Sequence, residues 1–219
     1  MKCDGCRFNI QTPKEIPLSK IIETSKNLYK EGYRKITITG GDPMYRKDLR
    51  EIVDSLYNIG FRIHLDTSGI PLLEDFSLKG LEEKIYLIGI PLDGTTKKII
   101  RKFRNTCPIG VKDIKKIIKL LSDNNFRISV NTVVHKDNIQ DLQGIYNIIS
   151  KYEGVKRWEL HQFSPTMSTR RDLFVDNKDF KTAVSRIKNP SGIEISPKSS
   201  MQKKFNKAIL FLPGGDDGN

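Results

Sequence analysis

The sequence predicts an α/β fold in which helices cover a parallel β-sheet. Short segments rich in β-branched residues alternate with longer segments whose apolar residues recur at helical spacing. The segments between successive strands have the length that a right-handed β-α-β crossover requires. From this pattern alone, the sheet is either curled into a barrel or open. The expected strands begin near residues 36, 62, 85, 127 and 156.

The first third of the chain contains two expected helices and two expected strands. Apolar residues recur at helical spacing over residues 18–31 and again over 49–56, and a glycine follows each run. Isoleucine alternates with threonine in the strand RKITITGG, which stops at a pair of glycines. The second strand is FRIHLDTSG, and it ends in a turn of small residues.

The remaining segments continue this alternation. A nearly continuous apolar run, KIYLIGIPLDG, is typical of a strand that is buried on both faces of a parallel sheet. Helices are expected over 111–121 and 142–149, and they are followed by the strands FRISVNTVV and VKRWELHQF. Beyond Pro165 we expect a helix over 176–188, short terminal strands in GIEIS and AILFLP, and a frayed tail.

The composition favours a single soluble domain. The chain has 219 residues of which 37% are hydrophobic, and its longest apolar stretches fall short of a membrane span. No leader sequence precedes them, so we expect a cytoplasmic protein without a membrane partner. The net charge of +12 could attract nucleic acid, but the lysines are spread along solvent-facing positions without interleaved aromatic residues. We therefore do not expect nucleic acid to be a partner.

Polar and glycine-rich motifs follow each of the expected strands. In parallel α/β folds, functional groups gather on the loops beyond the carboxyl ends of the strands, so these motifs are expected to share one rim of the sheet. The motifs are TGGDP at 39–43, DTSG at 66–69, PLDG at 91–94, NTVVHKDN at 131–138 and HQFSP at 161–165.

Two cysteines, Cys3 and Cys6, stand at C-x2-C spacing at the start of the sequence. Taken alone, they fit a redox pair, half of a zinc site or an exposed structural pair. Taken alone, TGGDP fits an ordinary strand-to-helix turn, with Asp42 as the helix N-cap and Pro43 at the first helical position. The remaining cysteine, Cys107, has no motif partner and is expected in the core or a loop.

Taken together and in order, the motifs resemble those of the radical S-adenosylmethionine (radical SAM) enzymes. KCDGCRF is similar to the last two cysteines of the family's C-x3-C-x2-C loop, and TGGDP is similar to its GGEP motif. DTSG is similar to the family's TNG-like turn, and IGIPLDG, VNTVVHKDN and RWELHQFSP are similar to its fourth, fifth and sixth strands. The likeness is to the viperin and molybdenum-cofactor branches.

The resemblance implies a partial (β/α) barrel, TIM-like, of about six strands, with the first strand missing from this sequence. It covers residues 1–170, the expected radical SAM core, and leaves 171–219 as a C-terminal extension of a helix and short strands. It also implies a 4Fe-4S cluster, for which Cys3 and Cys6 match the second and third ligands. The first ligand would fall two residues before Met1.

For S-adenosylmethionine, the resemblance implies a set of binding residues at the rim. The GGEP match is expected to meet the methionine ammonium, because glycines let the backbone approach and a carboxylate pairs with a cation. Arg104 matches an arginine that approaches the methionine carboxylate, for which a guanidinium fork is suited. Ser68, Asn131 and Gln162 match polar positions near the ribose and adenine. The GGEP match consists of Gly40, Gly41, Asp42 and Pro43.

The expected activity follows from the resemblance. One electron from the reduced cluster would cleave S-adenosylmethionine to methionine and a 5'-deoxyadenosyl radical, which would abstract hydrogen from a substrate that the sequence does not identify. An electron donor such as a flavodoxin or ferredoxin is implied. Two alternatives stay open at this point. The chain could be a non-catalytic α/β module that binds metal or nucleic acid, or a truncated, inactive radical SAM homologue.

Overall fold

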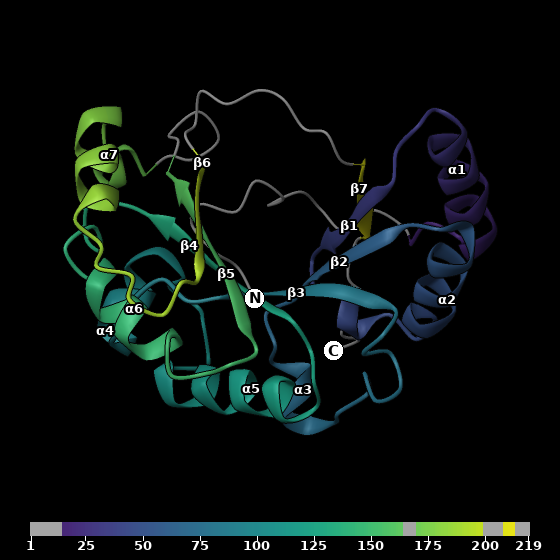
Figure 1. Ribbon diagram of the computed structural model, residues 1–219, viewed down its shortest axis with the longest axis horizontal. Coiled ribbons are helices and arrows are strands. Elements are labelled where there is room, and N and C mark those ends of the chain that lie inside the picture. The colour runs from purple at the N-terminus through teal and green to yellow at the C-terminus, as the bar shows by residue number, and fades with distance from the viewer. Residues whose placement is uncertain (1–14, 164–169, 199–207, 213–219) are drawn as a thin grey trace.

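A computed structural model describes residues 15–163, 170–198 and 208–212 of the chain. Its centre is an open sheet of seven strands in the order β6-β5-β4-β3-β2-β1-β7, and all neighbouring strands run parallel. Figure 1 shows the sheet as a curved wall with helices on its outer side. The strands are β1 (Lys35–Gly40), β2 (Arg62–Asp66), β3 (Ile85–Pro91), β4 (Ile128–Val134), β5 (Val155–Gln162), β6 (Glu194–Lys198) and β7 (Ala208–Leu212).

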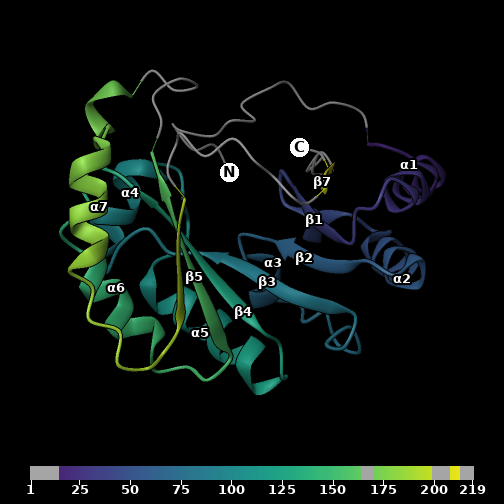
Figure 2. The same cartoon turned by 45° about the horizontal axis from the view of Figure 1, so that its top comes forward.

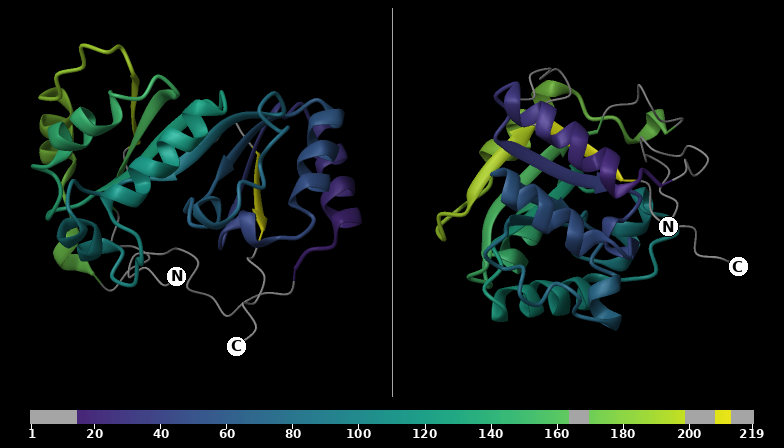
Figure 3. Two further views of the ribbon diagram at one scale, coloured as in Figure 1. Left: turned by 90° about the horizontal axis from the view of Figure 1, so that it is seen from below. Right: turned by 90° about the vertical axis from the view of Figure 1, so that its right-hand side faces the viewer.

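Helices fill the connections between the strands and cover the convex face of the sheet. Figures 2 and 3 show α1 and α2 side by side against one half of the sheet, and α5 and α6 against the other half. The α-helices are α1 (Leu18–Lys30), α2 (Leu49–Ile59), α3 (Pro71–Glu74), α4 (Lys97–Phe103), α5 (Val111–Asp123), α6 (Leu142–Ile149) and α7 (Asn177–Ser185). Two short 3-10 helices are η1 (Pro43–Tyr45) and η3 (Arg171–Leu173).

The hydrophobic core lies between the sheet and these helices. Strands β1 to β5 send alternate side chains into it, as the geometry of a strand requires. Ile36 and Ile38 of β1 and Val130 of β4 are fully buried there, and so is Trp158 of β5. The Trp158 indole donates to the Thr132 hydroxyl at 2.8 Å and packs near Tyr146 of α6. One ordered core therefore holds the helices to the convex face.

The intervening side chains of the strands point to the opposite, concave face, and many of them are polar. Thr37 of β1, Asp66 of β2, Asn131 of β4 and Glu159 of β5 alternate with core residues of the same strands. None of the helices described in the structure lies over this face in the views of Figure 1 and Figure 2. The concave face is therefore the surface on which the fold can present polar chemistry to a small molecule.

The predicted fold class is confirmed, but the number of strands differs and two helices were not predicted. The sheet is parallel, partial and unclosed, and the five expected strands begin within a residue or so of their predicted positions. The described residues contain seven strands rather than about six, because both short C-terminal segments pair with the sheet. β7 lies parallel to β1 at one edge of the sheet. Helices α3 and α4 were not predicted, because each is too short to show a helical repeat.

Within the described residues, no helix is long and apolar enough to cross a membrane.

The core makes a direct prediction about stability. Leu56 of α2 is fully buried, whereas Leu73 of α3 is 39% exposed. Leu56→Ala removes buried apolar volume and leaves a cavity, so we expect a loss of about 3 kcal/mol in the free energy of unfolding. Leu73→Ala, the matched control, should change it by less than about 0.5 kcal/mol. Denaturant unfolding of both variants measures the difference, and equal losses would show that α2 does not pack as described.

Candidate functional site

The carboxyl ends of β1 and β2 are joined by the side chain of Asp42. Its Oδ1 accepts hydrogen bonds from the Met44 backbone N–H at 3.1 Å and the Thr67 hydroxyl at 2.8 Å. Its Oδ2 accepts from the Ser68 backbone N–H at 2.9 Å and from the Ser68 hydroxyl. A carboxylate offers about four lone-pair sites. These contacts therefore use the acceptor capacity of Asp42, which is only 8% exposed.

Local structure explains why Asp42 lies here. It is the N-cap of the 3-10 helix η1, and Pro43 follows at the first helical position. Gly40 is the last residue of β1 and Gly41 is exposed, whereas Asp42 and Pro43 are buried. The rim of the sheet therefore presents the backbone of the glycine pair to solvent. The buried Asp42 carboxylate holds this loop in place from the inner side and so acts as a brace between the two loops.

The turn after β2 is fixed in shape by a glycine. Gly69 has a φ of 78°, and a Cβ atom at this position would lie 2.9 Å from the Ile117 side chain. The Gly69 N–H donates to the Thr67 hydroxyl at 3.0 Å, and the Ile70 N–H donates to the Ser68 hydroxyl at 3.2 Å. Hydrogen bonds within the turn therefore fix its conformation, and the Ser68 hydroxyl points toward Asp42.

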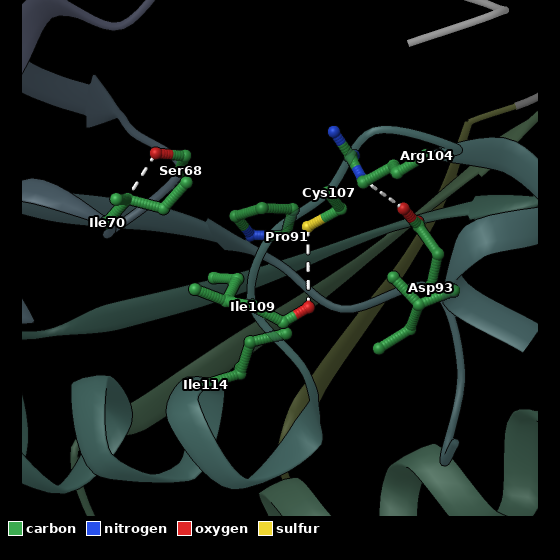
Figure 4. Close-up of a pocket in the computed structure, with 9 residues that line it drawn as sticks. Ser68, Ile70, Pro91, Asp93, Arg104, Cys107, Ile109 and Ile114 are labelled. Carbon is green, nitrogen blue, oxygen red and sulfur yellow. Dashed lines mark hydrogen bonds and ion pairs between the residues drawn. The ribbon is translucent and has the colours of Figure 1, made fainter. Parts of the chain in front are cut away.

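A small pocket opens beside this turn, between β3 and the end of α4 (Figure 4). The Arg104 guanidinium forms an ion pair with the fully buried Asp93, whose other oxygen accepts from the Val133 N–H at 2.7 Å. Ser68 and Pro91 line the same pocket as Arg104. The volume of about 10 Å³ is near the lower limit for one water molecule.

Cys107 also lines this pocket and is buried, with its Sγ 3.5 Å from the Ile109 carbonyl oxygen. The expectation of a core or loop residue is confirmed at this position. The thiol contacts apolar side chains on the inner wall of the pocket in Figure 4 and faces the loop that leads to α5.

A second group of polar side chains lies on the concave face and crosses three strands. Asn131 Nδ2 on β4 donates to Asp66 Oδ1 on β2 at 3.0 Å, and the Ser129 hydroxyl donates to Asn131 Oδ1 at 3.0 Å. Gly89 of β3 lies between β2 and β4. A Cβ atom there would come within 2.0 Å of Asp66 Oδ1 and 2.7 Å of Asn131 Nδ2. The bridge from β2 to β4 therefore requires glycine at position 89.

His64 extends this group along β2. Its Nε2 lies 3.2 Å from Asp66 Oδ1, in ion-pairing range, although the alignment does not meet hydrogen-bond geometry. The contact is electrostatic, because an imidazole nitrogen within 4 Å of a carboxylate interacts with it whatever the exact angle. His64 and Asp66 therefore lie side by side on the concave face.

Strand β5 turns its polar residues to both faces. Glu159 is almost fully buried, and its oxygens lie 3.2 Å from His161 Nε2 and 3.7 Å from an Arg157 guanidinium nitrogen. Gln162 follows the alternation to the other face, where its Nε2 donates to the Val175 carbonyl at 2.9 Å. The structure therefore does not bring Gln162 to the concave face, and it places Glu159 and His161 there instead.

His135, in the loop after β4, is fully buried at the rim. Its ring stacks on Phe103 with centroids 5.7 Å apart, and its Nδ1 accepts from the Asp137 N–H at 3.3 Å, while Nε2 has no hydrogen-bond partner in the described part of the chain. Burial lowers the pKa of His135 from its usual value of 6.5, and the nearby carboxylates of Asp93 and Asp137 oppose this shift without cancelling it. Neutral imidazole is therefore the favoured form.

The structure brings some predicted site residues together and separates others. The rim collects the glycine pair, Asp42, Ser68 and Arg104, and Asn131 lies on the adjoining concave face. Cys3 and Cys6 lie outside the described residues. Within the described ranges, no group of three or more His, Cys, Asp or Glu residues is arranged to hold a metal ion.

Sequence reasoning missed the bridge formed by Asp66 over Gly89. A signal was present, because an isolated glycine inside the apolar strand KIYLIGIPLDG marks a close approach of another group. The group that approaches could not be named from the sequence, because Asp66 and Asn131 are 65 residues apart in the chain.

Comparisons with known proteins bear on the family of the chain. The model of the family described as the radical SAM superfamily matches residues 1–149. An S-adenosylmethionine-dependent nucleotide dehydratase of Flammeovirga pacifica is 25% identical over 203 residues, which cover 85% of this chain and 68% of that protein. A probable GTP 3',8-cyclase of Pyrococcus horikoshii is 32% identical over 142 residues, which cover 64% of this chain and 43% of that protein.

Among solved structures, SuiB of Streptococcus suis bound to its precursor peptide SuiA has a TM-score of 0.72 at 14% identity. The match covers 90% of this chain and 46% of the SuiB chain, and it shows a common fold. The chain thus spans about half the length of SuiB, 43% of the cyclase and 68% of the dehydratase.

The bridge over Gly89 gives a prediction. Gly89→Ala would place a methyl group where Asp66 and Asn131 meet, so we expect a loss of about 1–3 kcal/mol in the free energy of unfolding from overpacking. Gly110→Ala is the matched control, because the nearest atom to a Cβ there is 3.7 Å away. Denaturant unfolding measures both. A cost at Gly89 no larger than that at Gly110 would contradict the close approach.

The buried His135 predicts a pH dependence of stability. Because its pKa is lowered by burial, the unfolded chain takes up a proton below pH 6.5 that the folded chain does not bind. The free energy of unfolding should therefore decrease as the pH falls from about 7.5 to about 5.5, and His135→Gln should flatten that decrease. His161→Gln, at a histidine whose side chain is 42% exposed, is the control. Equal pH dependence in the wild type and His135→Gln would refute the expectation.

Proposed function

The chain belongs to the radical SAM superfamily, and on that premise we propose that it is an enzyme which binds a 4Fe-4S cluster and S-adenosylmethionine at the rim of its sheet. The family uses both cofactors. The observation that carries the proposal is the brace formed by Asp42, which holds the TGGDP loop and the DTSG turn together beside the Arg104 pocket. These are the segments that match family motifs, and they meet in space.

The side chains present at the rim suit the functional groups of S-adenosylmethionine. Arg104 brings a guanidinium, which is suited to a carboxylate. Asn131, directed at the concave face, offers an amide that can meet ribose hydroxyls. The exposed backbone of Gly41 can approach a ligand closely because it has no side chain. The donors and acceptors thus fit an amino-acid head and a sugar.

We assign Asp42 a positioning role rather than direct pairing with the methionine ammonium. All of its acceptor sites are engaged by Met44, Thr67 and Ser68. An ammonium would meet backbone carbonyls of the loop that Asp42 braces. The same argument applies to Ser68, whose hydroxyl is committed to Asp42 and to the Ile70 N–H. Both residues shape the rim, and neighbouring groups contact the ligand.

Cys3 and Cys6 would hold two of the cluster's irons, because thiolates are the usual ligands of iron-sulfur clusters. When bound, the cluster and S-adenosylmethionine supply one-electron reductive chemistry that leads to hydrogen abstraction from a substrate. The chain's own contribution is to orient the cofactor at the rim and to keep the substrate on the concave face, away from bulk water. An electron donor of the flavodoxin or ferredoxin type would supply the electron.

The test uses the chain extended upstream of Met1 and reconstituted anaerobically with iron and sulfide. We expect about four irons per chain and reductive cleavage of S-adenosylmethionine. Cys6→Ala should lose the cluster, whereas Cys107→Ala should keep it, because Cys107 is buried beside Ile109 and has no ligand role in the proposal. Iron analysis and visible absorption measure both. The proposal fails if the wild-type chain incorporates no cluster, or if both cysteine variants lose it equally.

A further inference from the structure

Two arginines share one tyrosine ring at the amino-terminal end of the concave face. The guanidinium carbon of Arg62 lies 4.3 Å from the centroid of Tyr86, and that of Arg127 lies 5.0 Å from the same centroid. Arg62 opens β2, and Arg127 directly precedes β4. Tyr86 of β3 lies between them, so three neighbouring strands contribute to one cluster.

A β-bulge aims Tyr86 at this face. The register of β2 and β3 runs from Ile63 opposite Ile85 to His64 opposite Leu87, which leaves Tyr86 as the extra residue. Ile63 and Ile85 belong to the core. Arg62, which precedes Ile63, and Tyr86, which follows Ile85, therefore face the other way. Bulges that redirect a side chain are frequent next to functional sites.

The charges of this cluster are not neutralised within the described residues. Arg62 and Arg127 are both exposed, and neither has an ion pair or hydrogen-bond partner among the described side chains. Lys35 of β1 lies opposite Arg62 in register, is exposed, and adds a third cation without an ion-pair partner among the described residues. Arg157 of β5 is different, because Glu194 pairs with it at 2.9 Å.

Two guanidinium groups that contact the same ring concentrate positive charge at this end of the face, and the contact with the Tyr86 ring compensates only in part. An anion that bound beside the two guanidinium groups would offset this charge. A carboxylate brings one negative charge to three cations, whereas a phosphate chain brings several and matches the fork of arginine in geometry. We propose that Lys35, Arg62, Tyr86 and Arg127 form a binding site for the phosphate groups of a phosphorylated small molecule.

This site lies on the same face as the bridge between Asp66 and Asn131, at the other end of β2. Asp66 lies four positions beyond Arg62 along the strand, a distance of about 13 Å at the rise of a parallel strand. A molecule of that length could keep its phosphate groups on the arginines and place its other end near the rim. If the rim binds S-adenosylmethionine, as proposed above, this phosphorylated molecule is the substrate.

Binding of inorganic tripolyphosphate tests the site without requiring the cluster. The probe is titrated into the full chain at low salt and followed by calorimetry. We expect the double variant Arg62→Ala/Arg127→Ala to weaken binding by about tenfold or more, because each arginine supplies charge-assisted hydrogen bonds. The double variant Arg62→Lys/Arg127→Lys keeps the positive charge but loses the planar guanidinium groups. Its affinity for tripolyphosphate should lie between that of the alanine variant and that of the wild type.

The matched control is Arg101→Ala/Lys116→Ala, which removes the same charge from exposed positions on α4 and α5. It should retain wild-type binding, and thermal unfolding should show that all variants fold. Equal weakening in the control would overturn the proposal, because it would show non-specific attraction to a basic protein. Equal binding of citrate in the wild type would overturn the assignment to phosphate. Cleavage of S-adenosylmethionine without substrate tests the proposed function separately.

Discussion

The carboxylate of Asp42 joins the ends of β1 and β2, and the geometry of the rim depends on this junction. Parallel strands bring their carboxyl ends to one edge, but their loops are free to diverge unless something ties them together. Asp42 ties them by accepting hydrogen bonds from Met44 of its own loop and from Thr67 and Ser68 of the next. Because the carboxylate is buried, these bonds form in surroundings where a lost partner is costly.

The sheet divides the molecule into an apolar side and a polar side. On the convex side, residues such as Ile38 and Trp158 pack against helices. On the concave side, hydrogen bonds and ion pairs connect neighbouring strands. The hydrogen bond from Asn131 to Asp66 passes over Gly89, where no side chain fits. The fold thus keeps most of its apolar packing on one face and its cross-strand polar contacts on the other.

Two regions of the concave face differ in charge. Near the rim, carboxylates and amides such as Asp66 and Asn131 satisfy one another. At the amino-terminal end, Arg62 and Arg127 meet at Tyr86 without a described counter-ion. A ligand that spans the face would therefore meet hydrogen-bonded carboxylate and amide groups at one end and cations at the other. This gradient orients a molecule with one charged end.

The sequence by itself determined the parallel α/β class, the positions of strands β1 to β5, and the N-cap role of Asp42. These features could be predicted because alternation and capping depend on residues close together in the chain. Only the tertiary structure decided that β7 pairs with β1, that Gln162 turns away from the concave face and that Asp66 reaches Asn131 over Gly89. These contacts depend on strand order, register and bulges, and a shift of one residue in register moves a side chain to the other face.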